Sequence, residues 1–235
     1  LRYTSLKKIL NDMEIVKMYS QVNAAKTEQV IRLFKEACVK NLTLDPPVKT
    51  EQPFIVIDGE NYRRNNIITR LLAAKIKGFH ITHPPFCLKS FRYFFRKKTR
   101  IRRLYLMLLN YAAAYTAKHN EKQPTVVNGY WYEHAAYILS CLNFPLDQKA
   151  LESYQLPSDL LKPQLCFYIK DKVTIGHKKY FSPLFQTSTP KKLQILKNMY
   201  NITIVNENRT DEEIAQFMAD AYNTYLHNGT TVFNK

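Results

Sequence analysis

The residues of this chain that could do phosphate chemistry follow an apolar run at 54–57, where a glycine is succeeded by charged and amide side chains. Apolar residues with helical spacing come next, so the pattern predicts a strand, a tight loop and a helix. A phosphate-binding loop has this arrangement. Its glycines let backbone N–H groups surround the phosphates, a lysine supplies positive charge and a hydroxyl binds magnesium. The first question is therefore whether residues 59–66 could bind phosphate.

Only the first glycine of such a loop is present. With Gly59 at the first glycine position, Arg64 stands at the second, Asn65 replaces the lysine and Asn66 replaces the Ser or Thr. Arg64 brings a Cβ and a long side chain into space that the phosphates would fill, and it disfavours positive φ. Asn65 carries no charge, and the amide of Asn66 binds magnesium poorly. Losing one preorganised donor costs catalysis about 2.7–4 kcal/mol, so we interpret the loop as the remnant of a nucleotide kinase site.

Positive charge is the strongest feature of the composition. The 235 residues carry a net charge of +16, and the stretch from Asn61 to Asn120 contains 14 Lys and Arg but no Asp or Glu. Such a field attracts polyanions, which include nucleic acid, an acidic protein or an anionic lipid surface. A basic proteome such as that of the mitochondrial matrix is the alternative explanation.

Part of this basic block, residues 89–103, interleaves cations with aromatic residues. That pattern can bind single-stranded nucleic acid by base stacking and phosphate contacts. More often, however, such a pattern belongs to an amphipathic helix whose aromatic side chains are buried and whose charges face water. The candidate polyanion-binding residues are Lys89, Arg92, Arg96, Lys97, Lys98, Arg100, Arg102 and Arg103.

Cysteine, histidine and hydropathy patterns exclude several other classes of function. Four scattered cysteines with no close pair favour reduced or buried thiols over a disulfide framework. The six histidines lack a metal-like grouping with cysteines or carboxylates, so we expect no metal site. No apolar run approaches transmembrane length, so we expect no transmembrane segment.

Five apolar segments alternate with helical patterns and must position the candidate site. They predict a parallel sheet covered on both faces, in a three-layer α/β domain. The segments are 54–57, 78–82, 125–127, 165–169 and 201–205. Residues 1–50 have two helical apolar stripes and end at a Pro-Pro pair, so we predict a helical extension at 1–50 and one domain at 51–235. The first residue is Leu, which fits a processed or a partial chain.

Several short motifs occur in an order that resembles the thymidylate-kinase-like nucleoside monophosphate kinases, and most closely their mitochondrial UMP/CMP kinase branch. The similarity covers about residues 54–226 and is carried by Asn128-Gly129-Tyr130-Trp131, Ala135-Ala136-Tyr137, Thr82-His83-Pro84-Pro85, Arg102-Arg103, Asn110-Tyr111 and residues 154–163. The resemblance implies a P-loop-kinase-like fold with a five-stranded parallel sheet. It also places an acceptor-nucleotide pocket around 83–86 and Tyr111.

The departures from this family fall on its chemistry. The Asp-Arg pair that follows the family's third strand is replaced by Asn128 and Gly129, which removes a carboxylate and a guanidinium that grips phosphate. Residues 170–180, where the family carries a lid with arginines, contain no arginine. We therefore expect a degenerate catalytic pair and no catalytic residue.

Three hypotheses for function follow. In the first, the chain is a catalytically inactive kinase-like protein without cofactor, kept as a structural or interaction subunit of a mitochondrial protein assembly. In the second, Arg63 and Arg64 replace the missing lysine, and a UMP/CMP/TMP-kinase-like phosphotransferase survives with ATP and Mg²⁺ as cofactors. In the third, the basic block is an RNA-binding module whose affinity falls steeply with salt.

Overall fold

The computed structural model describes residues 5–19, 21–59, 61–91, 99–140, 152, 154–170, 190–200, 202–206 and 208–228. The chain forms two compact units. Unit 1 comprises Leu1–Glu51, Ile81–Glu121 and Leu156–Lys162, and unit 2 comprises Gln52–His80, Lys122–Gln155 and Pro163–Lys235. Within the described residues, no helix is long and apolar enough to cross a membrane.

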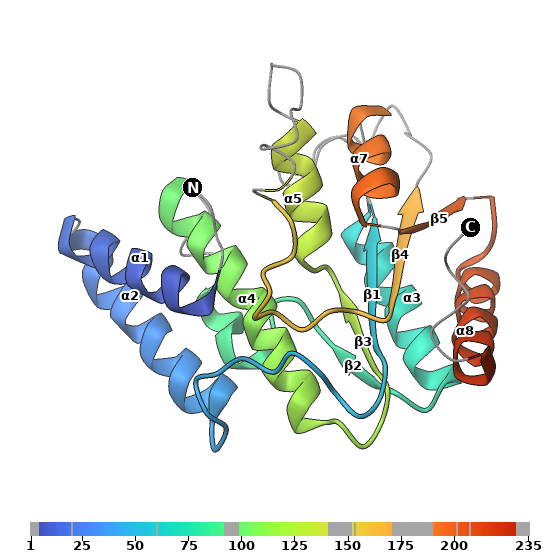
Figure 1. Ribbon diagram of the computed structural model, residues 1–235, viewed down its shortest axis with the longest axis horizontal. Coiled ribbons are helices and arrows are strands. Elements are labelled where there is room, and N and C mark those ends of the chain that lie inside the picture. The colour runs from blue at the N-terminus through green and yellow to red at the C-terminus, as the bar shows by residue number, and fades with distance from the viewer. Residues whose placement is uncertain are drawn as a thin grey trace. The chain divides into compact units, whose positions relative to one another are not determined.

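The five predicted strands form one sheet in the order β2-β3-β1-β4-β5 (Figure 1). Their bounds are β1 Phe54–Gly59, β2 Phe79–Ile81, β3 Thr125–Asn128, β4 Leu165–Lys170 and β5 Thr203–Asn206. β1 runs parallel to both β3 and β4, with Ile55 opposite Val126 and Leu165, and β4 runs parallel to β5. The predicted three-layer α/β architecture is therefore confirmed.

Side chains alternate across β1, as a strand buried on both faces requires. Ile55 and Ile57 pack with residues of α3 (Tyr62–Lys75) and α8 (Asp211–Asn228) in one core cluster. Phe54 points to the other face, where its ring meets Tyr130 edge to face at 5.1 Å. Full burial of such a side chain stabilises the fold by about 1.5–3 kcal/mol.

Two of the remaining helices of unit 2, α7 (Pro190–Tyr200) and α8, begin where local signals predict. α5 (Trp131–Ser140) and α7 pack together, and α7 starts on a proline, whose missing N–H is no loss there. A capping box opens α8, because the Thr210 N–H donates to Glu213 Oε2 at 2.7 Å and the Glu213 N–H donates to Thr210 Oγ1 at 3.2 Å. The hydrogen bonds that the Thr210 N–H and hydroxyl donate to the Glu213 carboxylate lower the pKa of that carboxyl.

Unit 1 holds α1 (Leu6–Tyr19), α2 (Gln21–Leu33), a π-helical turn η1 (Phe34–Val39), a 3₁₀ turn η2 (Phe86–Phe91) and α4 (Thr99–His119). The predicted apolar stripe of α1 is buried at Leu6, Ile9 and Met13. Phe34 packs edge to face against Tyr115 of α4, with ring centroids 5.7 Å apart. Residues 1–51 thus share a unit with 81–121, while the domain boundary at residue 50 stays a prediction.

One expectation for the cysteines is wrong. Cys38 of η1 and Cys87 of η2 form a disulfide with a Cα–Cα distance of 5.5 Å. The two residues are 49 positions apart, so their spacing in the sequence carries no sign that the fold brings them together. Cys166 is a free thiol, and Cys141 lies outside the described residues.

Candidate functional site

The segment that the sequence marks as a phosphate loop is almost entirely helical. β1 ends at Gly59 and α3 begins at Tyr62, which leaves only positions 60 and 61 between them. Asn61 caps the helix, since its side-chain oxygen accepts the Arg64 N–H at 3.2 Å. The Asn65 N–H donates to the Asn61 carbonyl at 2.8 Å. Amides that would face phosphates in a phosphate loop are here bonded to Asn61.

The glycine at the end of β1 is needed for packing. A Cβ on Gly59 would lie 2.6 Å from the carbonyl oxygen of Ile169 in β4, and 2.8 Å from the side-chain oxygen of Asn65. Asn65 is only 2% exposed, so its amide lies inside the protein against the Cα of Gly59. The residue at the lysine position therefore fills the space beside the strand, whereas Asn66 is partly exposed on α3.

Arg64, at the second glycine position, binds the start of α8. Its Nε lies 2.7 Å from Asp211 Oδ1, and its Nη2 donates to the carbonyl oxygen of Arg209 at 2.9 Å. The two ion-paired side chains are 20% and 27% exposed, so water screens the pair only in part. The neighbouring Arg63 is exposed. The Arg64 guanidinium thus joins α3 to α8 within unit 2.

Replacing Arg64 with alanine is expected to lower the free energy of unfolding by about 1–2 kcal/mol, because a half-buried charged hydrogen bond is lost. Denaturant unfolding of Arg64→Ala, Asp211→Ala and the double variant would measure the coupling between the two side chains. Arg63→Ala is the matched control on the same helical turn. Strictly additive effects of the two single substitutions would show that the ion pair contributes nothing.

The turn after β3 is held by buried polar groups. The Tyr130 N–H donates to Asp58 Oδ1 at 3.1 Å, and Asn128 Nδ2 donates to the Tyr62 carbonyl at 3.2 Å. The Gly129 N–H donates to the Ile57 carbonyl at 2.9 Å, and Gly129 has a φ of 89°, which favours glycine. Asn128 and Gly129, the predicted degenerate pair, therefore tie β3 to β1 and to the start of α3.

Burial dominates the electrostatics around this turn. Asp58 and Asn128 are each 1% exposed, and burial raises the pKa of the Tyr130 hydroxyl well above its usual value. Burial also raises the pKa values of Tyr132 and Tyr200, whose rings lie 4.7 Å apart. These phenols therefore stay protonated at neutral pH, and the Tyr200 hydroxyl donates a hydrogen bond to the Tyr154 carbonyl at 2.8 Å.

A second polar link lies in unit 1 and includes Tyr111, which the family resemblance places at the acceptor pocket. Tyr111 is fully buried, and its hydroxyl donates to Asp159 Oδ1 at 2.6 Å. The other oxygen of Asp159 accepts the N–H of Leu6, the first residue of α1, at 2.8 Å. Asp159 therefore connects α4 to the N-terminus of α1, where a carboxylate also complements the helix dipole.

The structure brings some predicted site residues together and leaves others apart. Gly59, Arg64, Asn65, Asn128 and Gly129 all lie around the end of β1 in unit 2. In the basic block, Lys89 and Arg103 are exposed and Arg102 is partly buried. Arg92, Arg96, Lys97 and Lys98 lie outside the described residues, as does segment 171–180, and Arg100 is described only as part of α4.

Sequence reasoning missed the three carboxylates that organise these contacts. Asp58 could have been noticed, because an acid at the end of an otherwise apolar strand must find a buried partner. Asp159 and Asp211 give no such local signal. Within the described ranges, no group of three His, Cys, Asp or Glu residues could hold a metal ion.

Comparison with known proteins supports the fold. No family model matches the chain, and no curated protein matches its sequence. Among solved structures, the chain is similar to the thymidylate kinase of Candida albicans, with a TM-score of 0.54 and 16% identity over 80% of this chain and 97% of that one. At this identity the likeness shows the fold alone, which is that of a P-loop nucleoside monophosphate kinase.

Proposed function

We propose that this chain is a catalytically inactive protein of nucleoside monophosphate kinase fold that serves as a structural or interaction subunit of a larger assembly. The observation that carries the proposal is the start of α3 at Tyr62, with only two positions between it and the end of β1. A phosphate loop needs a longer non-helical segment whose N–H groups converge on the phosphates. Here the helix occupies that segment.

The side chains at this place support the same conclusion. Arg64 is engaged by Asp211 and by the Arg209 carbonyl, and Asn65 is buried against Gly59. Neither offers a lysine-like charge to a γ-phosphate. Phosphoryl transfer depends almost wholly on positioning and charge stabilisation, so loss of both leaves little catalytic power.

A role in an assembly is supported by what the chain has beyond the kinase fold. Nearly all of the Candida thymidylate kinase, 97%, aligns with 80% of this chain, so 20% of this chain has no counterpart there. The acid-free basic stretch at 61–120 would favour an acidic protein surface. RNA or an anionic membrane is the alternative partner for these cations.

We also propose a mitochondrial location. It is supported by the resemblance of residues 128–131 and 154–163 to the mitochondrial kinase branch and by the net charge of +16. The Cys38–Cys87 disulfide narrows the proposal to a compartment in which thiol pairs can be oxidised. Cell fractionation combined with thiol alkylation tests both parts of it.

Titration calorimetry of the full chain tests the loss of nucleotide chemistry. ATP, UMP, CMP and TMP, each added up to millimolar concentration with and without Mg²⁺, are expected to release no binding heat. The physical reason is that the N–H groups, lysine and hydroxyl that bind phosphate and metal are missing or otherwise bonded at 59–66.

An active thymidylate kinase in the same buffers is the positive control for this experiment. Magnesium-dependent micromolar ATP binding, or phosphate transfer to any nucleoside monophosphate, would overturn the proposal.

One observation keeps a residual phosphotransferase as the second candidate: the Arg63 side chain is exposed on the first turn of α3. If Arg63 and Arg64 replaced the lysine, the double alanine variant would lose all turnover. Turnover that survives in this variant would reject that role for them.

A further inference from the structure

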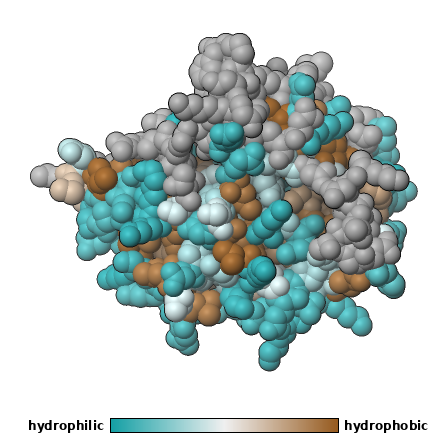
Figure 2. Space-filling view, in the orientation of Figure 1, coloured by the Kyte–Doolittle hydropathy of each residue, from teal (hydrophilic) through white to brown (hydrophobic). Residues whose placement is uncertain are grey.

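The hairpin of α1 and α2 in unit 1 has an exposed apolar end. Ile15 is 41% exposed, Met18 81% and Tyr19 83%, and their spacing puts the three side chains on one side of the last turn of α1. Apolar surface is visible in Figure 2 at the edge of the molecule where the turn between α1 and α2 lies in Figure 1. Large apolar side chains gathered in this way mark a contact surface.

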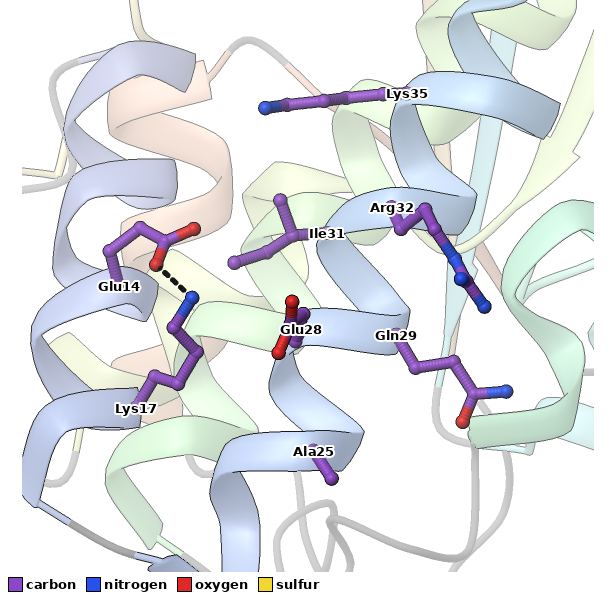
Figure 3. A pocket seen from close by; sticks show the side chains of 8 residues that line it. All are labelled: Glu14, Lys17, Ala25, Glu28, Gln29, Ile31, Arg32 and Lys35. Carbon is purple, nitrogen blue, oxygen red and sulfur yellow. Dashed lines mark ion pairs between the residues drawn. The ribbon is translucent and has the colours of Figure 1, made fainter.

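A groove of about 520 Å³ runs along the hairpin from this end (Figure 3). Ile31 lines this groove but is only 5% exposed. The lining side chains come from α1, α2 and the first turn of η1, and they are Glu14, Lys17, Ala25, Glu28, Gln29, Ile31, Arg32 and Lys35. From Ala25 to Lys35 the groove spans about 15 Å at the helical rise, which matches roughly three turns of a bound helix.

Charge is distributed unequally along this groove. Lys17 forms an ion pair with Glu14 at 2.6 Å. The hydrogen bond that Lys17 donates to Glu14, together with the charges of Glu14 and Glu28, raises the pKa of Lys17. Lys17 thus neutralises one of the two acids, Glu14 and Glu28, that line this part of the groove. Arg32 and Lys35 lie toward the other end and form no ion pair with any described residue. Figure 3 shows the Lys35 side chain extended toward α1 and the Arg32 side chain pointing away from α1.

We propose that the groove of the α1–α2 hairpin binds an acidic amphipathic helix from a partner subunit. Apolar side chains of that helix contact Met18 and Tyr19, and its carboxylates, about ten residues away, pair with Arg32 and Lys35. A helix lying in a groove between two helices buries an apolar stripe at spacings of three and four residues. The inference rests on the proposed role in an assembly and names the surface that serves it.

Two other occupants fit the surface less well. A nucleic acid would bring phosphates beside Glu14 and Glu28, and like charges in close contact cost affinity. A second copy of this chain would present the same excess of cations to Arg32 and Lys35. A partner that is apolar at one end and acidic at the other satisfies both ends of the groove.

Photo-crosslinking of the full chain in its own cells tests the proposal. Met18 is replaced by the photoreactive residue benzoylphenylalanine, and the crosslinked peptide is sequenced by mass spectrometry. We expect a segment of another protein that carries apolar residues at helical spacing and Asp or Glu about ten residues away. Lys35→Glu should lower the crosslink yield about tenfold, since charge reversal turns attraction into repulsion.

Lys26→Glu is the matched control, because Lys26 is exposed on α2 but does not line the groove, and it should leave the yield unchanged. Circular dichroism checks that each variant is folded. A crosslink to RNA, lipid, a second copy or a basic segment, an unchanged yield with Lys35→Glu, or no crosslink would overturn the inference.

Native gel electrophoresis of the same cells separates this inference from the proposed function. A chain that migrates in a large assembly without a Met18 crosslink would reject only the hairpin surface. A chain that migrates alone would reject the assembly role as well.

Discussion

Replacing Gly59 with alanine is expected to lower the free energy of unfolding by about 3 kcal/mol or more. The added Cβ would lie 2.6 Å from the carbonyl oxygen of Ile169, which is backbone of the neighbouring strand and cannot rotate away. Overpacking of this kind costs about 1–3 kcal/mol when side chains can adjust, and more when backbone must move. Denaturant unfolding followed by circular dichroism measures the loss.

Two further variants separate the causes of this loss. Asn65→Ala in the Gly59→Ala background removes the second close contact, at 2.8 Å, so it should restore a minor part of the stability. Asn66→Ala, on the partly exposed side of α3, is the control and should change stability by less than about 0.5 kcal/mol. A Gly59→Ala protein as stable as the parent would contradict the packing role of this glycine.

This prediction separates two reasons for a glycine after a strand. In a nucleotide-binding loop, glycine lets backbone amides approach a phosphate, and its substitution mainly reduces ligand affinity. In this chain Gly59 lets β1, β4 and the buried Asn65 approach one another. Substitution is therefore expected to reduce stability without any nucleotide present.

The fold was predictable wherever a signal is local in the sequence. Each strand is an apolar run bounded by turn-forming residues, and the start of α8 is encoded by Thr210 and Glu213, three positions apart. The order of the strands has no local signal in the sequence, and it was not predicted. The family resemblance implied only a five-stranded parallel sheet, which the likeness to a thymidylate kinase supports at the level of fold.

The contacts that define the site were not predictable, because they join residues far apart in the chain. Arg64 and Asp211 are 147 positions apart, and Tyr111 and Asp159 are 48 apart. The number of residues between the two members of such a pair does not show that the fold brings them together. The sequence could mark Arg64 as unsuited to a phosphate loop, but not assign it to the start of α8. The Cys38–Cys87 disulfide was missed for the same reason.

Two polar links, one in each unit, each hold two helices together. In unit 2, Arg64 holds α3 to α8, and in unit 1, Asp159 holds α4 to α1. A protein that acts through its surface needs rigid helices more than it needs a mobile active site. We expect the link through Asp159 to contribute more to stability than the link through Arg64, since one carboxylate there accepts hydrogen bonds from a fully buried hydroxyl and from a helix terminus.

Replacing Asp159 with alanine is expected to lower the free energy of unfolding by about 4 kcal/mol. The substitution removes hydrogen bonds of 2.6 Å to the Tyr111 hydroxyl and 2.8 Å to the Leu6 N–H. Hydrogen bonds to a charged group contribute about 1.5–3 kcal/mol each, and the buried Tyr111 hydroxyl would lose its acceptor. Asp159→Asn keeps the shape and one acceptor oxygen, so it should cost about half as much.

A double-mutant cycle with Tyr111→Phe assigns the loss to this link, with an expected coupling of about 1.5–3 kcal/mol. Asp45→Ala, which removes an exposed acid in the same unit, is the control and should have little effect. Limited proteolysis should cut Asp159→Ala first within residues 5–51, because α1 loses its N-terminal partner. If the stability losses of Asp159→Ala and Tyr111→Phe are additive and the proteolytic cleavage pattern is unchanged, the Asp159 carboxylate does not hold α1 to α4.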